Sequence, residues 1–243
     1  MTRAIGLAGI ALMTLAGGGA CSRSDQPASR TATTADSLPP QAMTDEWRPL
    51  FDGKTTTGWR EFRKPSISPG WKVIDATLVR ADSGAGDIIT DEQFRNFELE
   101  LEWMLPKGGN SGVFYRATEA VDTIWKAAPE MQILDDANHA DGKSPLTSAG
   151  ASYGLYPAPR GVVRPADQWN TARLVVNGNH VEHWLNGTKL LEYELGSADW
   201  KDRVAKSKFN TRPLYGKAEQ GHIGLQDHDN RVAFRNIRIR VLP

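Results

Sequence analysis

Residues 174–193 read LVVNGNHVEHWLNGTKLLEY and contain three short apolar runs separated by two Asn-Gly turns. Asn-Gly between apolar runs is the strongest short-range signal for a β-hairpin, because the turn that suits the strand twist requires positive φ at its central residues. The runs at 174–176, 181–185 and 190–193 therefore predict a three-stranded antiparallel meander.

The rest of the folded region also shows strand patterns. Residues 97–103, FELELEW, alternate apolar and acidic side chains, which is the period of a strand with one face in water. The last strand changes the parity of its apolar residues, which predicts a β-bulge near Arg235-Asn236. The one short helix that the pattern allows covers 198–206. Many strands, Gly/Asn turns and little helix predict an all-β, antiparallel β-sandwich or barrel.

The N-terminal segment has the features of an export signal. Residues 1–20 combine an early positive charge, an apolar stretch and small residues, and they end directly before Cys21. This arrangement resembles the lipobox of bacterial lipoproteins, in which the thiol is acylated; ordinary cleavage that leaves a free thiol is the alternative. Residues 21–44 are rich in Ser, Thr, Ala and Pro and are expected to form a disordered tether, and 45–243 to form the folded domain. We expect an exported protein of the cell envelope that meets the membrane only through its lipid, or else a secreted one.

Composition excludes several function classes. The 243 residues carry a formal net charge of zero and no basic arm, which argues against binding to nucleic acid. The single cysteine excludes an intrachain disulfide and a thiolate metal cluster. The eight tryptophans fill a large core or offer flat apolar surfaces to sugar rings.

Two strands near 130–135 and 221–228 separate apolar from polar side chains by their alternation. The apolar set, expected in the core, is Met131, Ile133, Ile223 and Leu225. The opposite set is Glu130, Gln132, His222, Gly224, Gln226 and His228. Amides and carboxylates pair well with the hydroxyl groups of a sugar, and Gly224 leaves its backbone open to a ligand. A merely solvated face is the alternative.

Loops supply further candidates. The turn at 108–112 contains Asn110 and leads to Arg116, which either reaches the pocket or only follows a tight turn. The long connections 117–129 and 138–150 carry Trp125 and His139, and connections of this length are usually functional or mobile. No zinc-type spacing and no nucleophile elbow is present. No cofactor is evident. A divalent cation, such as calcium bound by Asp135, Asp136, Asn138 and Asp141, is an open alternative.

Taken together and in order, six blocks resemble the 3-keto-disaccharide hydrolase family, which is described as 3-keto-glucoside 1,2-lyase and 3-keto-2-hydroxyglucal hydratase. The blocks are FDGKTTTGW (51–59), NSGVFYR (110–116), EMQILD (130–135), SAGASYGLYP (148–157), QWNTARLVVNGNHVEHWLNG (168–187) and GHIGLQDHDNRVAFRNIRIR (221–240). The resemblance covers about residues 46–243. It implies a concanavalin A-like jelly roll of two antiparallel sheets with the ligand in a concave face. It also implies an oligosaccharide or glycoside as substrate.

The reaction that the resemblance implies starts from a ketone at C3 of the sugar, which acidifies the C2 hydrogen. A base removes this proton, the C1 oxygen leaves by elimination, and water adds to the enone. From side-chain chemistry we expect His228 as base or leaving-group acid, Glu130 in the same role if burial raises its pKa, and Tyr153 as a donor to the enolate. The expected substrate-binding residues are Arg116, Gln132, Gln226, Asn110, Trp125, Trp184, Asp135 and His139. The alternative function is a non-catalytic, lectin-like carbohydrate-binding lipoprotein.

Overall fold

The computed structural model describes residues 44–243. The expected signal segment, Cys21 and nearly all of the expected tether lie outside the described residues.

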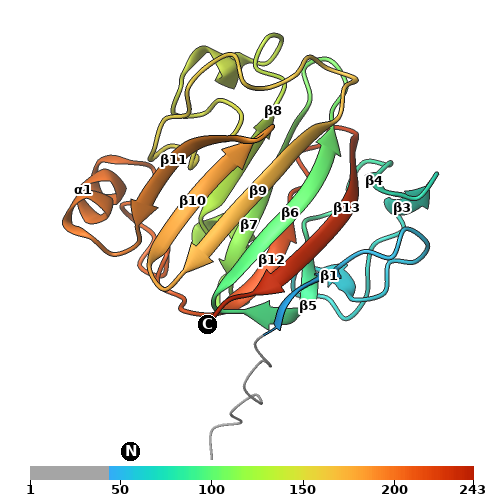
Figure 1. The fold of residues 1–243 in the computed structure, drawn as a ribbon, viewed down its shortest axis with the longest axis horizontal. Coiled ribbons are helices and arrows are strands. Elements are labelled where there is room, and N and C mark those ends of the chain that lie inside the picture. The colour runs from blue at the N-terminus through green and yellow to red at the C-terminus, as the bar shows by residue number, and fades with distance from the viewer. Residues whose placement is uncertain (1–43) are drawn as a thin grey trace, which may run out of the picture. The chain divides into compact units, whose positions relative to one another are not determined.

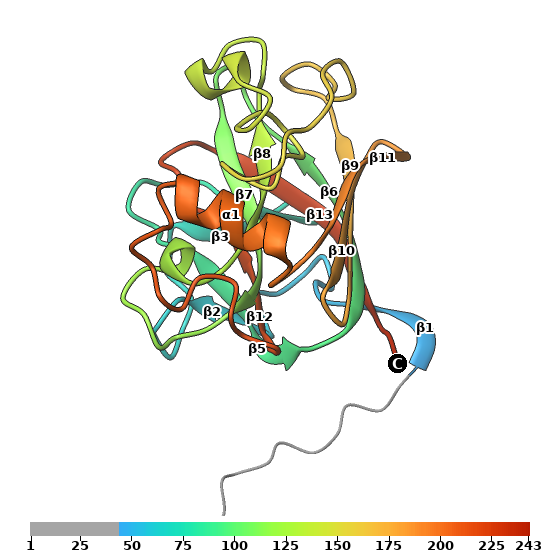
Figure 2. The same ribbon diagram turned by 90° about the vertical axis from the view of Figure 1, so that its left-hand side faces the viewer.

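The described chain folds into two antiparallel sheets that pack face to face (Figures 1 and 2). The eight-stranded sheet has the order β11 (Thr188–Glu194), β10 (His180–Leu185), β9 (Asn170–Asn177), β6 (Phe97–Met104), β13 (Val232–Val241), β4 (Thr77–Arg80) and β3 (Trp71–Ile74), and β1 (Thr44–Pro49) pairs with β13. The five-stranded sheet has the order β2 (Trp59–Glu61), β5 (Ile88–Phe94), β12 (Gly221–Leu225), β7 (Asn110–Ala117) and β8 (Glu130–Leu134). The prediction of an all-β, antiparallel sandwich is confirmed.

The two turns of the predicted meander differ in detail. Asn186 and Gly187 join β10 to β11 with φ of 49° and 81°, as a turn with two positive φ values requires. In the turn between β9 and β10, Gly178 has a φ of 59°, whereas Asn179 is not in the positive-φ region. The meander is therefore confirmed, and the glycine alone supplies the positive φ of its first turn.

The predicted helix is α1 (Ala198–Lys206), beside β11 at one edge of the sandwich in Figure 1. The Ser197 side chain accepts a hydrogen bond from the Trp200 amide at 3.1 Å and caps the helix. Two short 3-10 helices, Ile124–Lys126 and Ala140–Lys143, lie in the long connections around β8.

The predicted bulge in the last strand is present. The pairing of β13 with β6 shifts between Arg235 and Arg238, and Asn236 has a φ of 52°. The extra residue keeps the apolar side chains on both sides of the bulge in the core. These side chains are Val232, Phe234, Ile237, Ile239 and Val241.

The outer face of β6 carries the acidic residues of the alternating pattern. Glu100 pairs with Arg238 at 2.6 Å and Glu102 with Arg235 at 2.7 Å. Glu98 was expected in water, but it is buried between the guanidinium groups of Arg173 and Arg240. Arginine side chains of the neighbouring strands thus take the place of solvent around the Glu98 carboxylate.

The main core fills the space between the sheets, and β8 and β12 contribute Met131, Ile133, Ile223 and Leu225 to it. On β7 the side chain of Phe114 points away from the main core. Phe114 belongs to a second, small apolar cluster with Ile89, Ala117, Ile124 and Ala128. This cluster lies on the other face of the five-stranded sheet. Over the described residues, 44–243, no helix has the length and apolar character needed to cross a membrane.

Candidate functional site

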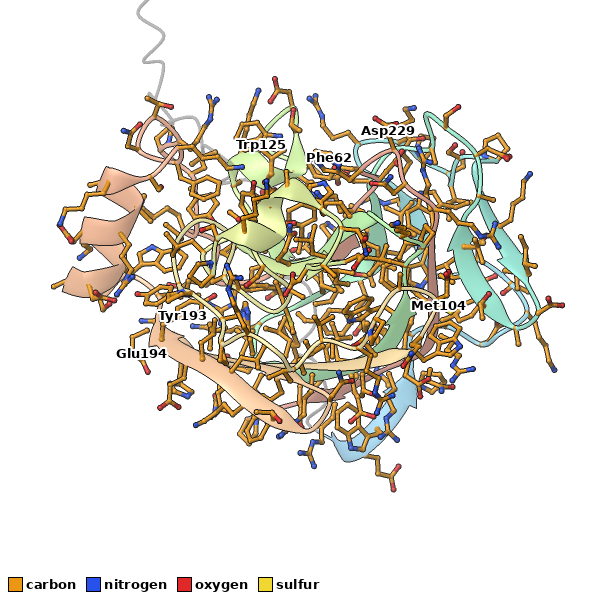
Figure 3. All side chains as sticks on the ribbon, turned by 90° about the horizontal axis from the view of Figure 1, so that it is seen from above. Phe62, Met104, Trp125, Tyr193, Glu194 and Asp229 are labelled. Carbon is orange, nitrogen blue, oxygen red and sulfur yellow. The ribbon has the colours of Figure 1, made fainter. Side chains whose placement is uncertain are left out.

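A polar cavity of about 300 Å³ lies on the face of the five-stranded sheet that points away from the main core. Its walls come from the sheet and from segments that connect the strands. The lining residues are Asp87, Asn110, Thr123, Trp125, Glu130, Gln132, Tyr153, Lys208, Gln226, Asp227 and His228. Figure 3 shows Trp125 and Glu194 of β11 on opposite sides of the molecule, so the cavity is remote from the outer face of the eight-stranded sheet.

A second cavity of about 340 Å³ lies near the β3–β4 turn and the end of β6. The Trp169 ring there is covered by the Arg235 guanidinium, whose Cζ lies 4.0 Å from the ring centre. The polar cavity, in contrast, gathers carboxyl, amide, phenol, imidazole and ammonium groups, and we take it as the candidate active site.

Glycine on β7 makes room for the central carboxyl group of the cavity. Gly112 pairs with Gln132 across the β7–β8 ladder, and a Cβ at Gly112 would lie 2.2 Å from Oε1 of Glu130. In the amide orientation that satisfies its surroundings, Gln132 donates to Glu130 Oε1 at 3.1 Å and to the Ser111 carbonyl at 3.0 Å. The strand pair thus fixes the Glu130 carboxyl group in one place.

Burial dominates the acidity of Glu130. The residue is 6% exposed, and burial raises its pKa to about 8. The charges of Asp87 and Asp141 act in the same direction, whereas Lys208 and a hydrogen bond from Gln226 oppose the shift. The cavity therefore holds a carboxyl group that can exchange a proton near neutral pH.

A second acidic group stands at the cavity wall. Burial raises the pKa of Asp87 to about 6, and the nearby Asp227 charge adds to this, although the Asp227 amide donates to Asp87 Oδ1 at 2.9 Å. Asp227 itself lies 2.6 Å from Nε of the buried Arg80. This ion pair anchors the segment that follows β12, which carries the remaining cavity residues of that strand.

That segment presents Gln226 and His228 to the cavity. The Gln226 amide donates to the Gly112 carbonyl at 3.0 Å, which fixes its backbone. Its side-chain Oε1 is buried and, within residues 44–243, has no hydrogen-bond partner. His228 is exposed at the rim. An unpaired buried acceptor beside an imidazole is suited to a ligand with hydroxyl groups.

The loop after β8 holds the phenol of the site. Tyr153 Oη donates to Asp141 Oδ2 at 3.2 Å. Burial raises the pKa of Tyr153 to about 12, and the Asp141 charge contributes. His139 Nδ1 accepts a hydrogen bond from the Asp141 amide at 3.1 Å. His139 therefore shapes the loop that positions Tyr153.

The structure brings most of the predicted site residues together. Those that line the cavity are His228, Glu130, Tyr153, Gln132, Gln226, Asn110 and Trp125. Arg116, Trp184, Asp135 and His139 do not line it.

The prediction that Arg116 reaches the cavity is wrong. The pairing of β12 with β7 shifts between His222 and Gly224, and Arg116 has a φ of 50°. This irregularity breaks the strand alternation. The guanidinium turns away and its Nη2 donates to the carbonyls of Arg95 and Gly178, at 2.8 and 2.6 Å.

Trp184 and Asp135 are also elsewhere. Trp184 lies on β10 of the other sheet, with the Arg173 guanidinium 4.8 Å from its ring centre and its Nε1 donating to Glu182. Asp135 is buried and accepts hydrogen bonds from the Gly108 amide and the Asn138 side chain. Both residues have structural contacts at these positions.

The expected row on β12 is interrupted. A Cβ at Gly224 would lie 2.7 Å from Cδ1 of Ile124, so this glycine accommodates the small apolar cluster and does not open the backbone to a ligand. His222 is buried, and its Nδ1 donates to the Thr90 carbonyl at 2.6 Å. His222 is therefore a structural histidine.

Four cavity residues were not foreseen: Asp87, Thr123, Lys208 and Asp227. Asp87 directly precedes β5, and a polar residue at a strand end is a weak signal that could have marked it. Lys208 comes from an irregular segment after α1, where no periodicity assigns a side chain to any face.

Within residues 44–243, the one close group of His, Asp and Glu ligand atoms lies outside the cavity. In the loop that was considered for calcium, Asp136 accepts from the Ala149 amide and Asp141 from Tyr153. His180, Glu182 and Glu192 on the β10–β11 hairpin have ligand atoms within 4.8 Å of one another, but Lys189 already bridges the two carboxylates.

Comparison with known proteins agrees with a carbohydrate-active site. The family model described as the 3-keto-alpha-glucoside-1,2-lyase-like domain matches residues 46–240. A 3-keto-disaccharide hydrolase of Bacteroides thetaiotaomicron is 36% identical over 242 residues, covering 87% of this chain and 83% of the relative. A crystal structure of a Parabacteroides distasonis protein, proposed to be a glycosyl hydrolase, has 33% identity and a TM-score of 0.76 over 81% of this chain and 94% of that one. A second such protein of the same organism has 30% identity and a TM-score of 0.65, covering 81% of this chain and all of its own.

Proposed function

Because the chain belongs to the 3-keto-alpha-glucoside-1,2-lyase-like family and is an enzyme of the hydrolase type, we propose that it cleaves 3-keto-glycosides by elimination at C1 followed by hydration. The observation that carries this proposal is the buried Glu130 carboxyl group, with its pKa raised to about 8, in a cavity lined by amides and hydroxyl donors.

The chemistry needs one strong base and no nucleophile. Proton loss at C2 leaves an electron pair that forms the C2–C3 double bond while the C3 carbonyl oxygen takes the negative charge. When the C3 carbonyl re-forms, the electron pair of the C2–C3 double bond moves to C1–C2, the C1–O bond breaks, and the leaving oxygen takes a proton. Water then adds across the enone, with hydroxide at C1 and a proton at C2. The net result is hydrolysis.

Glu130 is suited to the C2 proton transfer. A carboxylate whose conjugate acid has a pKa near 8 is a much stronger base than one in water, and it becomes the neutral form that burial favours when it accepts the C2 proton. This reverses the order expected from side-chain chemistry alone, in which His228 came first. In this proposal His228, which is exposed at the rim, gives a proton to the departing oxygen.

Amides hold the sugar in this proposal. Asn110, Gln132 and the unpaired Oε1 of Gln226 offer acceptors and donors to ring hydroxyl groups. Trp125 serves as a cavity wall, because the cations of Lys208 and Arg212 lie 5.4 and 5.1 Å from its ring centre. A site that pairs hydroxyl groups in this way rejects analogues that leave buried polar atoms unpaired.

Elimination can be tested by isotope exchange at C2. Cleavage of a 3-keto-disaccharide in deuterated water should place deuterium at C2 of the released keto sugar, because water supplies the returning proton. A transient enone absorbance should accompany the reaction. Mass spectrometry and ultraviolet spectroscopy measure the two signals. Cleavage with neither solvent deuterium at C2 nor any enone would exclude the elimination route.

We also propose export and lipid attachment at Cys21, from the apolar segment and small residues that precede it. In cells grown with a labelled fatty acid, the wild-type protein should acquire the label and the Cys21→Ser protein should not. The substituted protein should keep its activity, since Cys21 lies outside the folded domain expected at 45–243. Label that persists in Cys21→Ser would contradict the anchor.

A further inference from the structure

Lys208 places its ammonium group among aromatic rings at the cavity wall. Its Nζ lies over three rings, 4.2 Å from the ring centre of Tyr153, 5.2 Å from Phe209 and 5.4 Å from Trp125. Within residues 44–243 its ammonium makes no ion pair and no hydrogen bond. The ring faces hold it electrostatically while its N–H donors stay available.

Two lysines close to Lys208 or to the cavity wall in sequence differ in this respect. Lys126 pairs with Asp122 and Lys206 with Asp202, each at 2.7 Å. Lys208 as a whole residue is exposed, yet its ammonium is partly desolvated by its surroundings, which lowers its pKa. The carboxyl groups of Glu130 and Asp141 both act on Lys208 and raise its pKa, and Glu130 is itself mostly protonated at neutral pH. The Lys208 charge is therefore balanced only at a distance, and the share that comes from Glu130 disappears once Glu130 has taken up a proton.

The C3 oxygen is where the proposed reaction creates an anion. Glu130 becomes neutral when it accepts the C2 proton, and the negative charge passes to that oxygen. Tyr153 was expected to donate to the enolate, but its hydroxyl already donates to Asp141. Arg116, the other predicted cation, donates its hydrogen bonds to the carbonyls of Arg95 and Gly178. Among the described residues that line the cavity, Lys208 is the one cation left to stabilise the negative charge on the C3 oxygen.

We infer that the Lys208 ammonium donates a charge-assisted hydrogen bond to the C3 oxygen and stabilises the enolate formed when the C2 proton leaves. This inference rests on the proposed function and deepens it. A cation fixed where charge develops stabilises the transition state more than the bound ketone, so it acts on the chemical step. The aromatic rings around Lys208 fix the position of that charge before the substrate arrives.

The test uses K208M, K208R and the control K206M, whose lysine lies on α1 and is paired with Asp202. K208M should lower kcat by about a hundredfold to a thousandfold with little change in KM, and should slow C2 exchange by the same factor. K208R should recover part of both rates. K206M should behave as wild type, and thermal melting should show all three folded.

A pH profile distinguishes a charge from mere packing. The Lys208 charge lowers the pKa of Glu130, so the rising limb of kcat/KM should move to higher pH in K208M and stay in place in K208R. A folded K208M with wild-type kcat and exchange would overturn the inference. A reduced covalent adduct on Lys208 after borohydride trapping would also overturn it, because the nitrogen would then act by forming an imine. If the wild-type protein itself neither cleaves the keto substrate nor exchanges C2, the proposed function fails first.

Discussion

Glu130→Gln should lower kcat for a 3-keto-disaccharide by at least about a hundredfold, because the amide keeps the shape of the carboxyl group but cannot accept the C2 proton. In the wild type, kcat/KM should rise with pH and level off above about pH 8, where the buried carboxyl group is ionised. Steady-state rates from pH 5 to 9 measure both effects. A variant that retains wild-type kcat would place the base elsewhere in the cavity.

The same substitution should change stability in the opposite direction. The pKa of Glu130 is about 8 in the folded chain and near 4.5 when unfolded, so ionisation favours the unfolded state. The wild type should therefore lose stability between pH 4.5 and 8, by about 3–5 kcal/mol at about 1.4 kcal/mol per pKa unit. Glu130→Gln should escape this loss, so its advantage in melting temperature should grow with pH.

Glu119→Gln is the matched control. Glu119 pairs with Arg60 at 2.6 Å outside the cavity, and this partner lowers its pKa. The control should keep full activity and gain no stability as the pH rises. An equal gain in both variants would show that a general loss of negative charge, and not the burial of Glu130, causes the effect.

Ile223→Ala should destabilise the fold by about 2–5 kcal/mol, because the side chain is fully buried in the main core beneath the cavity. Urea unfolding at pH 7 measures the change. The folded fraction should retain wild-type kcat, since Ile223 faces away from Glu130 and Gln226. A folded Ile223→Ala protein as inactive as Glu130→Gln would contradict the assignment of the two faces.

Local patterns predicted the parts of the fold that depend on neighbours in sequence. The Asn-Gly turns, the capped helix at 198–206 and the bulge near Arg235-Asn236 each follow from backbone requirements of a few residues. Alternation also assigned Glu130 and Gln132 to one face and Ile133 to the other.

The errors in the predicted site have physical causes that the alternation of residues along a strand does not reveal. An irregularity at Arg116 reverses the expected side-chain direction. Trp184 does lie on an outward face, but alternation does not say to which sheet that face belongs. Lys208 reaches the cavity from an irregular segment, and the burial that raises the pKa of Glu130 is produced by loops distant in sequence.

The most direct test of the account is the choice of substrate. Purified protein should be incubated with a 3-keto-disaccharide and with its unoxidised parent, in metal-free and in metal-supplemented buffer, and the released sugars measured by chromatography. Only the ketone acidifies the C2 hydrogen, so the account predicts that the keto sugar is cleaved and the parent is left intact. Comparable cleavage of the unoxidised parent would contradict it, because that bond can break only by a mechanism that the proposed site does not use.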